Sequence, residues 1–245
     1  MDAERKHRDT IKKKYMQRYA QATMADKLKA QGFTSYNDEN LSWYKIVNNE
    51  ILQTVFIYSS WHYFPLLVTL VYGVHPLFIM PPFPHKVVEL GWAGDRETES
   101  LVRYTGLRKA FSDDISVQCP ATEGCGAELL DTVVFPVFAQ TNTIEDAYTF
   151  FKNRYLTSDW AWVVTSDFID MAIWMNDKDM YSHCIDTIKR LQNASIGRYW
   201  LKSDAKRNQL QYEAIVEGKR DEYLKVLEKR KTQILRKLEK GQIKT

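Results

Sequence analysis

The sequence has few cysteines, and their number bears on the cellular compartment of the protein. Among 245 residues only Cys119, Cys125 and Cys184 carry a thiol. So odd and sparse a set does not make the disulfide framework of a secreted protein, and it predicts a reducing compartment. The first residues are charged and lack the apolar stretch of an export signal. We therefore expect a cytoplasmic location.

Charge is missing from one long internal stretch. Residues 51–84 contain no Asp, Glu, Lys or Arg, but His62, Pro65, Gly73 and Pro76 interrupt them. No run of the ~18 apolar residues that a spanning helix needs survives between these positions. The apolar blocks are short and rich in β-branched and aromatic residues, which favours strands. The stretch predicts a buried sheet and no membrane partner.

Motifs for a cofactor or a metal are also missing. The glycines around Cys125 lack the spacing and the lysine of a phosphate-binding loop. Cys119 and Cys125 stand too far apart for a zinc-binding pair, and no histidine lies nearby. The net charge of +3, from 34 basic and 31 acidic residues, does not require a polyanionic partner. We expect neither cofactor nor metal.

What is present predicts an α+β fold. Apolar residues at steps of three and four predict a helix over residues 2–31, which Gly32 ends. Two strands follow at 41–47 and 50–58, and Asn48-Asn49 suits the tight turn between them. A third strand at 66–75 carries the run Leu-Leu-Val-Thr-Leu-Val-Tyr, which suggests cover on both faces and predicts a central position. The first helix should cover one face of this small antiparallel sheet.

The second half of the chain has a helical pattern. Pro136 should end or kink the first helix, and Thr143 with Asp146 should cap the second. Residues 204–240, rich in charge, predict one long terminal helix, in which Lys231 interrupts the apolar stripe. The sequence leaves open whether two copies of the chain form a homodimer through this helix. The four helices before it are expected at residues 127–138, 144–155, 165–175 and 178–191.

These elements predict two units. The first is an α+β domain over residues 1–200, with its sheet part at about 33–118 and its helical part at about 127–191. The second is the charged helix of residues 201–245.

The order of these features resembles that of an uncharacterised family of bacterial domains of unknown function. The resemblance covers roughly residues 20–191. It implies a fold, and it brings no activity or catalytic residue to this chain. The residues that carry it are Leu28, Gly32-Phe33, Trp43-Tyr44-Lys45-Ile46-Val47, Gln53-Thr54-Val55-Phe56-Ile57 and Thr143-Ile144-Glu145-Asp146-Ala147.

Carboxylates offer the best candidates for acid–base chemistry. Asp167 and Asp170 are three residues apart, so they share a helix face, and Asp113 stands next to Asp114. The simpler interpretation of Asp167 is a first-turn acid favoured by the helix dipole. Adjacent His183 and Cys184 would point about 100° apart on a helix, which does not make a nucleophile–base pair. Cys184 is better explained as a small buried side chain.

Aromatic loops are the most distinctive feature of the sequence. If exposed, they offer rigid contact area to a protein partner; if buried, they form a seam between sheet and helices. The sequence therefore favours a noncatalytic protein-binding module of regulatory or toxin-neutralising type. The first alternative is a hydrolase-like enzyme that uses His62 or His85 with a carboxylate. The candidate binding residues are Trp61, His62, Tyr63, Phe64, His85, Trp160 and Trp162.

Basic residues at both ends of the chain give a second alternative, nucleic-acid binding. Acids such as Glu222 and Glu228 are interleaved with the C-terminal set, which favours a solvated helix instead. The basic residues concerned are Arg5, Lys6, Arg8, Lys12, Lys13 and Lys14, with Lys219, Arg220, Lys229, Arg230 and Lys231.

Overall fold

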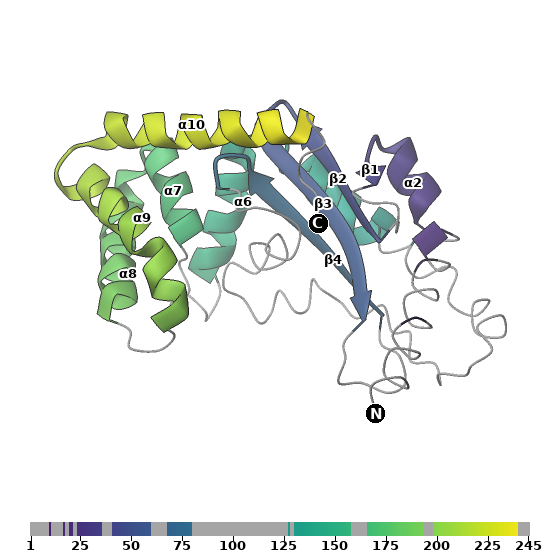
Figure 1. Cartoon of the computed structure of the whole chain (residues 1–245), viewed down its shortest axis with the longest axis horizontal. Coiled ribbons are helices and arrows are strands. Elements are labelled where there is room, and N and C mark those ends of the chain that lie inside the picture. Colours follow the sequence, from purple (N-terminus) through teal and green to yellow (C-terminus); the bar gives the residue numbers. More distant parts are fainter. Residues whose placement is uncertain are drawn as a thin grey trace.

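A small antiparallel sheet and a set of helices confirm the α+β class (Figure 1). The computed structural model describes residues 24–35, 41–59, 68–79, 130–157, 166–193 and 198–239, with single positions 10, 17, 20, 21 and 127. Figure 1 shows the sheet beside the helices α6 to α9, and helix α10 lies across both.

The first described helix is α2 (Ala25–Ala30), the C-terminal part of the helix predicted over residues 2–31. It ends as predicted, because Gly32 takes the positive φ of 80° that glycine allows after a helix. The amide of Phe33 then donates to the carbonyl of Leu28 at 2.9 Å. Leu28 and Phe33 are both buried in the main core, next to the sheet residue Trp43. The N-terminal helix thus packs on the sheet.

The sheet has four described strands in the order of the chain. The prediction of a central third strand is wrong for this sheet, because β4 pairs with β3 alone among the described strands and lies at its end. From Gly73 through the turn after β4 to Ile79 the residues are all buried, so both faces are covered at this end of the strand even though it lies at the edge of the described sheet. The strands are β1 (Thr34–Ser35), β2 (Ser42–Val47), β3 (Ile51–Ser59) and β4 (Val68–Pro76).

The hairpin between β2 and β3 forms where the sequence predicted it. Asn48 and Asn49 have φ of 53° and 54°, a conformation that asparagine adopts more readily than most residues. The amide of Glu50 donates to the carbonyl of Val47 at 3.0 Å and closes the turn.

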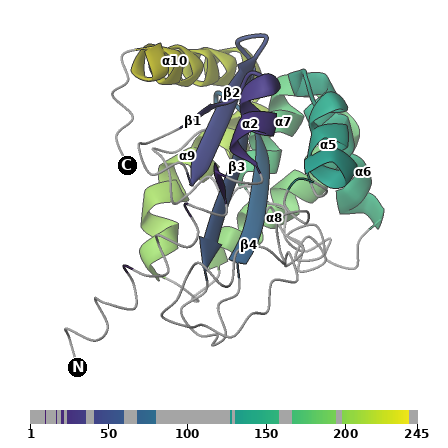
Figure 2. The same ribbon diagram turned by 90° about the vertical axis from the view of Figure 1, so that its right-hand side faces the viewer.

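The two faces of the sheet are covered by different helices. Trp43 and Val55 pair in register on one face, which belongs to the main core. From the same face Gln53 donates to the carbonyl of Phe138 in α5 at 3.0 Å. The opposite face carries Leu52, which packs with residues of α10. Figure 2 shows α5 and α6 to one side of the strands and α10 across their end.

Pro136 distorts the helix in which it lies, as predicted. A π-helical turn, η4 (Leu130–Val134), precedes the short helix α5 (Phe135–Ala139). Pro136 has no amide hydrogen and its ring crowds the carbonyl four residues earlier, so the regular hydrogen-bond pattern cannot pass through it. Helix α6 (Ile144–Thr157) follows, and the amide of Asp146 donates to Oγ1 of Thr143 at 3.1 Å, which confirms the predicted cap.

The remaining helices form a bundle beside the sheet. Trp174 of α7 connects the two parts, because its ring stacks on Phe78, just after β4, with centroids 4.6 Å apart. The elements are α7 (Ser166–Met175), the 3₁₀ turn η5 (Lys178–Met180), α8 (Tyr181–Asn193), α9 (Arg198–Val216) and α10 (Arg220–Glu239).

The single long helix predicted over residues 204–240 is wrong. It is two helices, because the chain leaves the helical conformation at Gly218, where φ is 72°. A glycine takes this left-handed conformation at little steric cost. The break turns α10 back over the bundle and the sheet (Figure 1).

Helix α10 packs its apolar stripe on the chain itself. Tyr223 and Leu227 enter the main core, while Ile234 and Leu238 form a second cluster with Leu52 and others of the sheet. Among the residues that the structure describes, no helix has the length and apolar character needed to cross a membrane.

Candidate functional site

The main polar cluster of the described residues lies at the centre of the bundle, around a buried carboxylate. Asp170 lies in the middle of α7, between apolar neighbours, and is fully buried. Asp167 lies one turn earlier on the same face, so the predicted alignment of the two carboxylates is confirmed. Its place in the first turn of α7 also agrees with the helix-dipole interpretation.

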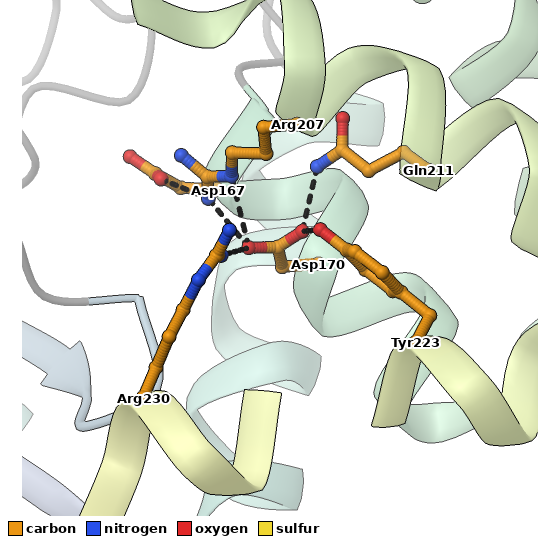
Figure 3. A network of polar contacts seen from close by, with 6 residues as sticks. All are labelled: Asp167, Asp170, Arg207, Gln211, Tyr223 and Arg230. Carbon is orange, nitrogen blue, oxygen red and sulfur yellow. Dashed lines mark hydrogen bonds and ion pairs between the residues drawn. The ribbon is translucent and has the colours of Figure 1, made fainter. Parts of the chain in front are cut away.

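Two further helices supply the donors that surround Asp170 (Figure 3). Its Oδ1 accepts from the hydroxyl of Tyr223 in α10 and from Nε2 of Gln211 in α9, the latter at 2.6 Å. Its Oδ2 accepts from Nε and Nη2 of Arg207 at 3.0 and 2.6 Å, and from Nη1 of Arg230 at 3.4 Å. Arg207 also pairs with Asp167. We call these six residues the Asp170 network.

The Asp170 network is neutral overall, since it holds two carboxylates and two guanidinium groups. Burial lowers the pKa of Arg207, but the carboxylates of Asp170 and Asp167 outweigh it and hold that pKa above its ordinary value. Burial raises the pKa of Tyr223, and the neighbouring Asp170 raises it further. Arg207 therefore stays protonated and charged, and Tyr223 stays protonated and neutral, across the ordinary pH range.

This arrangement suits packing better than catalysis. Both oxygens of Asp170 already accept hydrogen bonds from the protein, so neither is poised to take a proton from a substrate. A buried ion that is fully hydrogen-bonded fixes the relative position of the elements that supply its partners, here α7, α9 and α10.

A second polar cluster lies at the turn between α7 and α8. Asp177 accepts hydrogen bonds from the hydroxyl of Tyr148, at 2.8 Å, and from the ammonium of Lys152, both in α6. Burial raises the pKa of Asp177, but the bonds from Lys152 and Tyr148 outweigh it and bring that pKa below its ordinary value. The preceding Asn176 has a φ of 56°, which turns the chain sharply. This cluster ties α6 to the turn.

A third group of polar side chains lies within the sheet. His75 and Thr54 are buried on neighbouring strands, and neither Nε2 of His75 nor Oγ1 of Thr54 has a hydrogen-bond partner among the residues that the structure describes. Both atoms lie above Gly73, where a side-chain carbon would stand 3.0 Å from Oγ1 and would collide with Nε2. Burial lowers the pKa of His75 to about 3, so the imidazole is neutral at ordinary pH.

The binding residues proposed from the sequence lie outside the described residues. The same holds for Asp113 and Asp114, for Cys119 and Cys125, and for the basic residues of positions 5–14. The proposed binding residues are Trp61, His62, Tyr63, Phe64, His85, Trp160 and Trp162.

The structure agrees with the interpretation of His183 and Cys184. His183 is exposed on α8 while Cys184 is fully buried, so the two side chains point apart. Burial raises the pKa of the Cys184 thiol to about 12, which keeps it protonated. In the described ranges, no group of three or more His, Cys, Asp and Glu side chains could hold a metal ion.

The basic residues near the C-terminus do not converge on one surface. Arg220 donates to the carbonyls of Ile173 and Trp174 at the end of α7. Arg230 belongs to the Asp170 network, and the ammonium of Lys231 lies 5.9 Å from the centre of the Trp174 ring. Three of the five proposed phosphate contacts thus face the body of the protein.

Sequence reasoning missed the partners of Asp170. The sequence did contain a pattern that could have indicated these partners: on each of two helices, one charged residue interrupts an apolar stripe. Asp170 interrupts the apolar run of α7, and Arg230 stands between Leu227 and Ile234 on the buried side of α10. A cation and an anion at such positions favour a buried pair.

Comparison of the chain with protein-family models, with curated proteins and with solved structures finds no match in any of the three.

Proposed function

We propose that this chain is a noncatalytic protein-binding module of regulatory or toxin-neutralising type, and that the outer face of α10 is part of its contact surface. The observation that carries this proposal is a long exposed helix face held rigidly on the body of the protein.

The rigidity comes from contacts along the whole inner side of α10. Near its start Tyr223 donates to Asp170, and at its middle Arg230 reaches the same carboxylate. Near its end Ile234 and Leu238 pack on the sheet. A partner that binds the opposite side would therefore meet a preformed surface and would not have to order it.

The charge of the outer face supports a protein partner over a nucleic acid. A phosphate backbone would be repelled by acids interleaved with the cations, whereas a protein surface can match both signs. The exposed face holds four cations and four anions: Lys225, Lys229, Arg236 and Lys237 with Asp221, Glu222, Glu228 and Glu239.

The Asp170 network supports the noncatalytic part of the proposal. It occupies the carboxylate pair that the sequence offered for acid–base chemistry, and it uses that pair to join three helices. The hydrolase alternative rests on His62 or His85, and no described contact favours it.

The cytoplasm is the proposed location, and bacteria are the proposed source, in keeping with the resemblance stated above. A buried, protonated thiol at Cys184 fits a reducing compartment, because it neither forms nor requires a disulfide.

The test is the isolation of a stoichiometric complex. The purified chain is cross-linked in a bacterial lysate, and each captured protein is purified and mixed with it for analytical ultracentrifugation. We expect a complex of defined stoichiometry that Lys229→Glu with Arg236→Glu weakens at least about tenfold, since several charged contacts contribute together.

A matched variant controls for net charge. Lys189→Glu with Lys206→Glu changes the same number of exposed cations on α8 and α9 and should leave the affinity within about threefold. The proposal fails if no captured protein forms a complex with the purified chain, or if the chain instead shows salt-dependent retention on DNA or RNA.

A further inference from the structure

His75 is a buried imidazole at the place where α10 meets the sheet. It is 1% exposed, and it pairs in register with Leu52 of β3. Leu52 packs in one cluster with Ile234 and Leu238 of α10 and with Leu77, which follows β4. The residue that pairs with His75 is therefore part of the surface on which α10 is seated.

The elements packed around His75 offer little to stabilise a positive charge. On β3 and β4 its neighbours are Leu52, Thr54 and Gly73, and Leu52 in turn packs with Ile234 and Leu238 of the helix. The cause of the shift in the pKa of His75 is burial, with no charge contribution. Titratable side chains of this part of the sheet, placed by register and sequence, are Tyr44 of β2 and Glu50 of the turn before β3. On the end of α10, Arg236, Lys237 and Glu239 are exposed.

We propose that protonation of His75 at low pH releases the C-terminal half of α10 from the sheet, so that Ile234 and Leu238 lose their contacts with it. An imidazolium would need water or an acceptor at Nε2, and in the seated state that atom is buried with no acceptor from the described part of the chain. Release of the helix end supplies water to the ring, while the Asp170 network keeps the N-terminal half of α10 in place.

The size of the effect follows from proton linkage. In the seated state the pKa of His75 is about 3, and in the released state it returns toward its ordinary 6.5. A group with a lowered pKa favours the seated state at high pH, and this preference is lost as the pH falls from about 6.5 toward 3. The ratio of released to seated molecules then rises about tenfold for each pH unit in that window.

Hydrogen–deuterium exchange of the full chain measures this ratio, with labelling times scaled to the intrinsic exchange rate at each pH. We expect the protection of residues 231–239 to fall about 100-fold between about pH 7.5 and pH 4.5. Residues 221–227, at the Tyr223 end of α10, should keep most of their protection.

Substitution of the two described histidines, His75 on β4 and His183 on α8, separates the effect of His75 from general effects of acid. His75→Leu should abolish the loss of protection, whereas His183→Leu, at an exposed position on α8, should leave it unchanged. His75→Gln, which is polar but does not titrate, serves if the leucine variant does not fold. The proposal is overturned if the His75 variants retain the loss, or if both halves of α10 lose protection together, which would indicate global unfolding.

Discussion

At the scale of single residues, Asp170 is where the contacts between α7, α9 and α10 converge. Its carboxylate is fully buried, so its desolvation is offset only by the donors around it. Removing the carboxylate would leave the buried Arg207 with Asp167 as its counter-charge in the network, and would take from Tyr223 and Gln211 the acceptor that they share. The cost of such a change exceeds the net contribution of the contacts themselves, because the remaining buried groups have lost water as well as this partner.

Asp170→Ala should therefore lower the free energy of unfolding by about 3–5 kcal/mol. Asp167→Ala is the matched control, since its side chain is 13% exposed and also pairs with Arg207. We expect it to cost about 1–2 kcal/mol. Urea unfolding at neutral pH followed by circular dichroism measures both values, and equal losses would contradict the central role of Asp170.

Asp177 should govern part of the acid limb of the stability curve. Its pKa is lowered in the folded state, so its contribution is present above its unfolded pKa of 3.8 and is lost as the pH falls through the folded value. Asp177→Asn should flatten the dependence of unfolding free energy on pH below about pH 4. Asp179 is an exposed neighbour in η5, and Asp179→Asn should leave the pH dependence of the unfolding free energy as it is in the wild type. If the unfolding free energy of the Asp177 variant depended on pH as steeply as that of the wild type, Asp177 would not be a cause of the loss of stability in acid.

At the scale of elements, Gly218 decides that the terminal segment is two helices. Its φ of 72° lies in the left-handed region, where a residue with a side chain has a strained backbone. A side-chain carbon at this position would have no other atom within 4 Å, so steric collision would add nothing to that strain. Gly218→Ala should therefore cost about 1–2 kcal/mol through the backbone alone. Gly218→Asn should cost less, because asparagine tolerates this conformation. Thermal unfolding of the two variants ranks them, and an alanine variant as stable as wild type would show that the turn has another conformation available.

The elements that the sequence predicted are those whose signal is local. Asn48-Asn49, Gly32 and the Thr143 cap each act within a few residues, so their turns and helix ends could be placed without knowing the rest of the fold. The two-residue strand β1 was missed, because so short a segment has no pattern of its own and exists only by pairing with β2. The end position of β4 was missed because burial on both faces looks the same in sequence at the edge and at the centre.

The candidate site was less predictable than the fold. The alignment of Asp167 and Asp170 follows from helical spacing, but Arg207, Gln211 and Tyr223 come from other helices 37 to 53 residues away. Their approach depends on how α9 and α10 turn back over α7, which no local pattern fixes. The break at Gly218 that allows this return was itself missed.

At the scale of the whole molecule, α10 joins the bundle to the sheet. Its first half is bound to α7 through Tyr223 and Asp170, and its second half packs Ile234 and Leu238 on the sheet. The main core also crosses the boundary, through the stacking of Phe78 on Trp174. Because both parts share these contacts, we expect the intact chain to unfold in one cooperative transition.

Removal of α10 should break this cooperativity. A chain that ends at Glu217 loses both halves of the helix, so Leu52 and Leu77 become exposed and Asp170 loses two of its donors. We expect the near-ultraviolet and far-ultraviolet unfolding curves to separate and the dye ANS to bind, as it does to loosely packed states. The control keeps the helix and replaces its outward cations Lys225, Lys229 and Arg236 with alanine, which should leave coincident curves because exposed charges contribute little to stability. Coincident curves in the shortened chain would mean that the Phe78–Trp174 contact and the main core couple the two parts without α10.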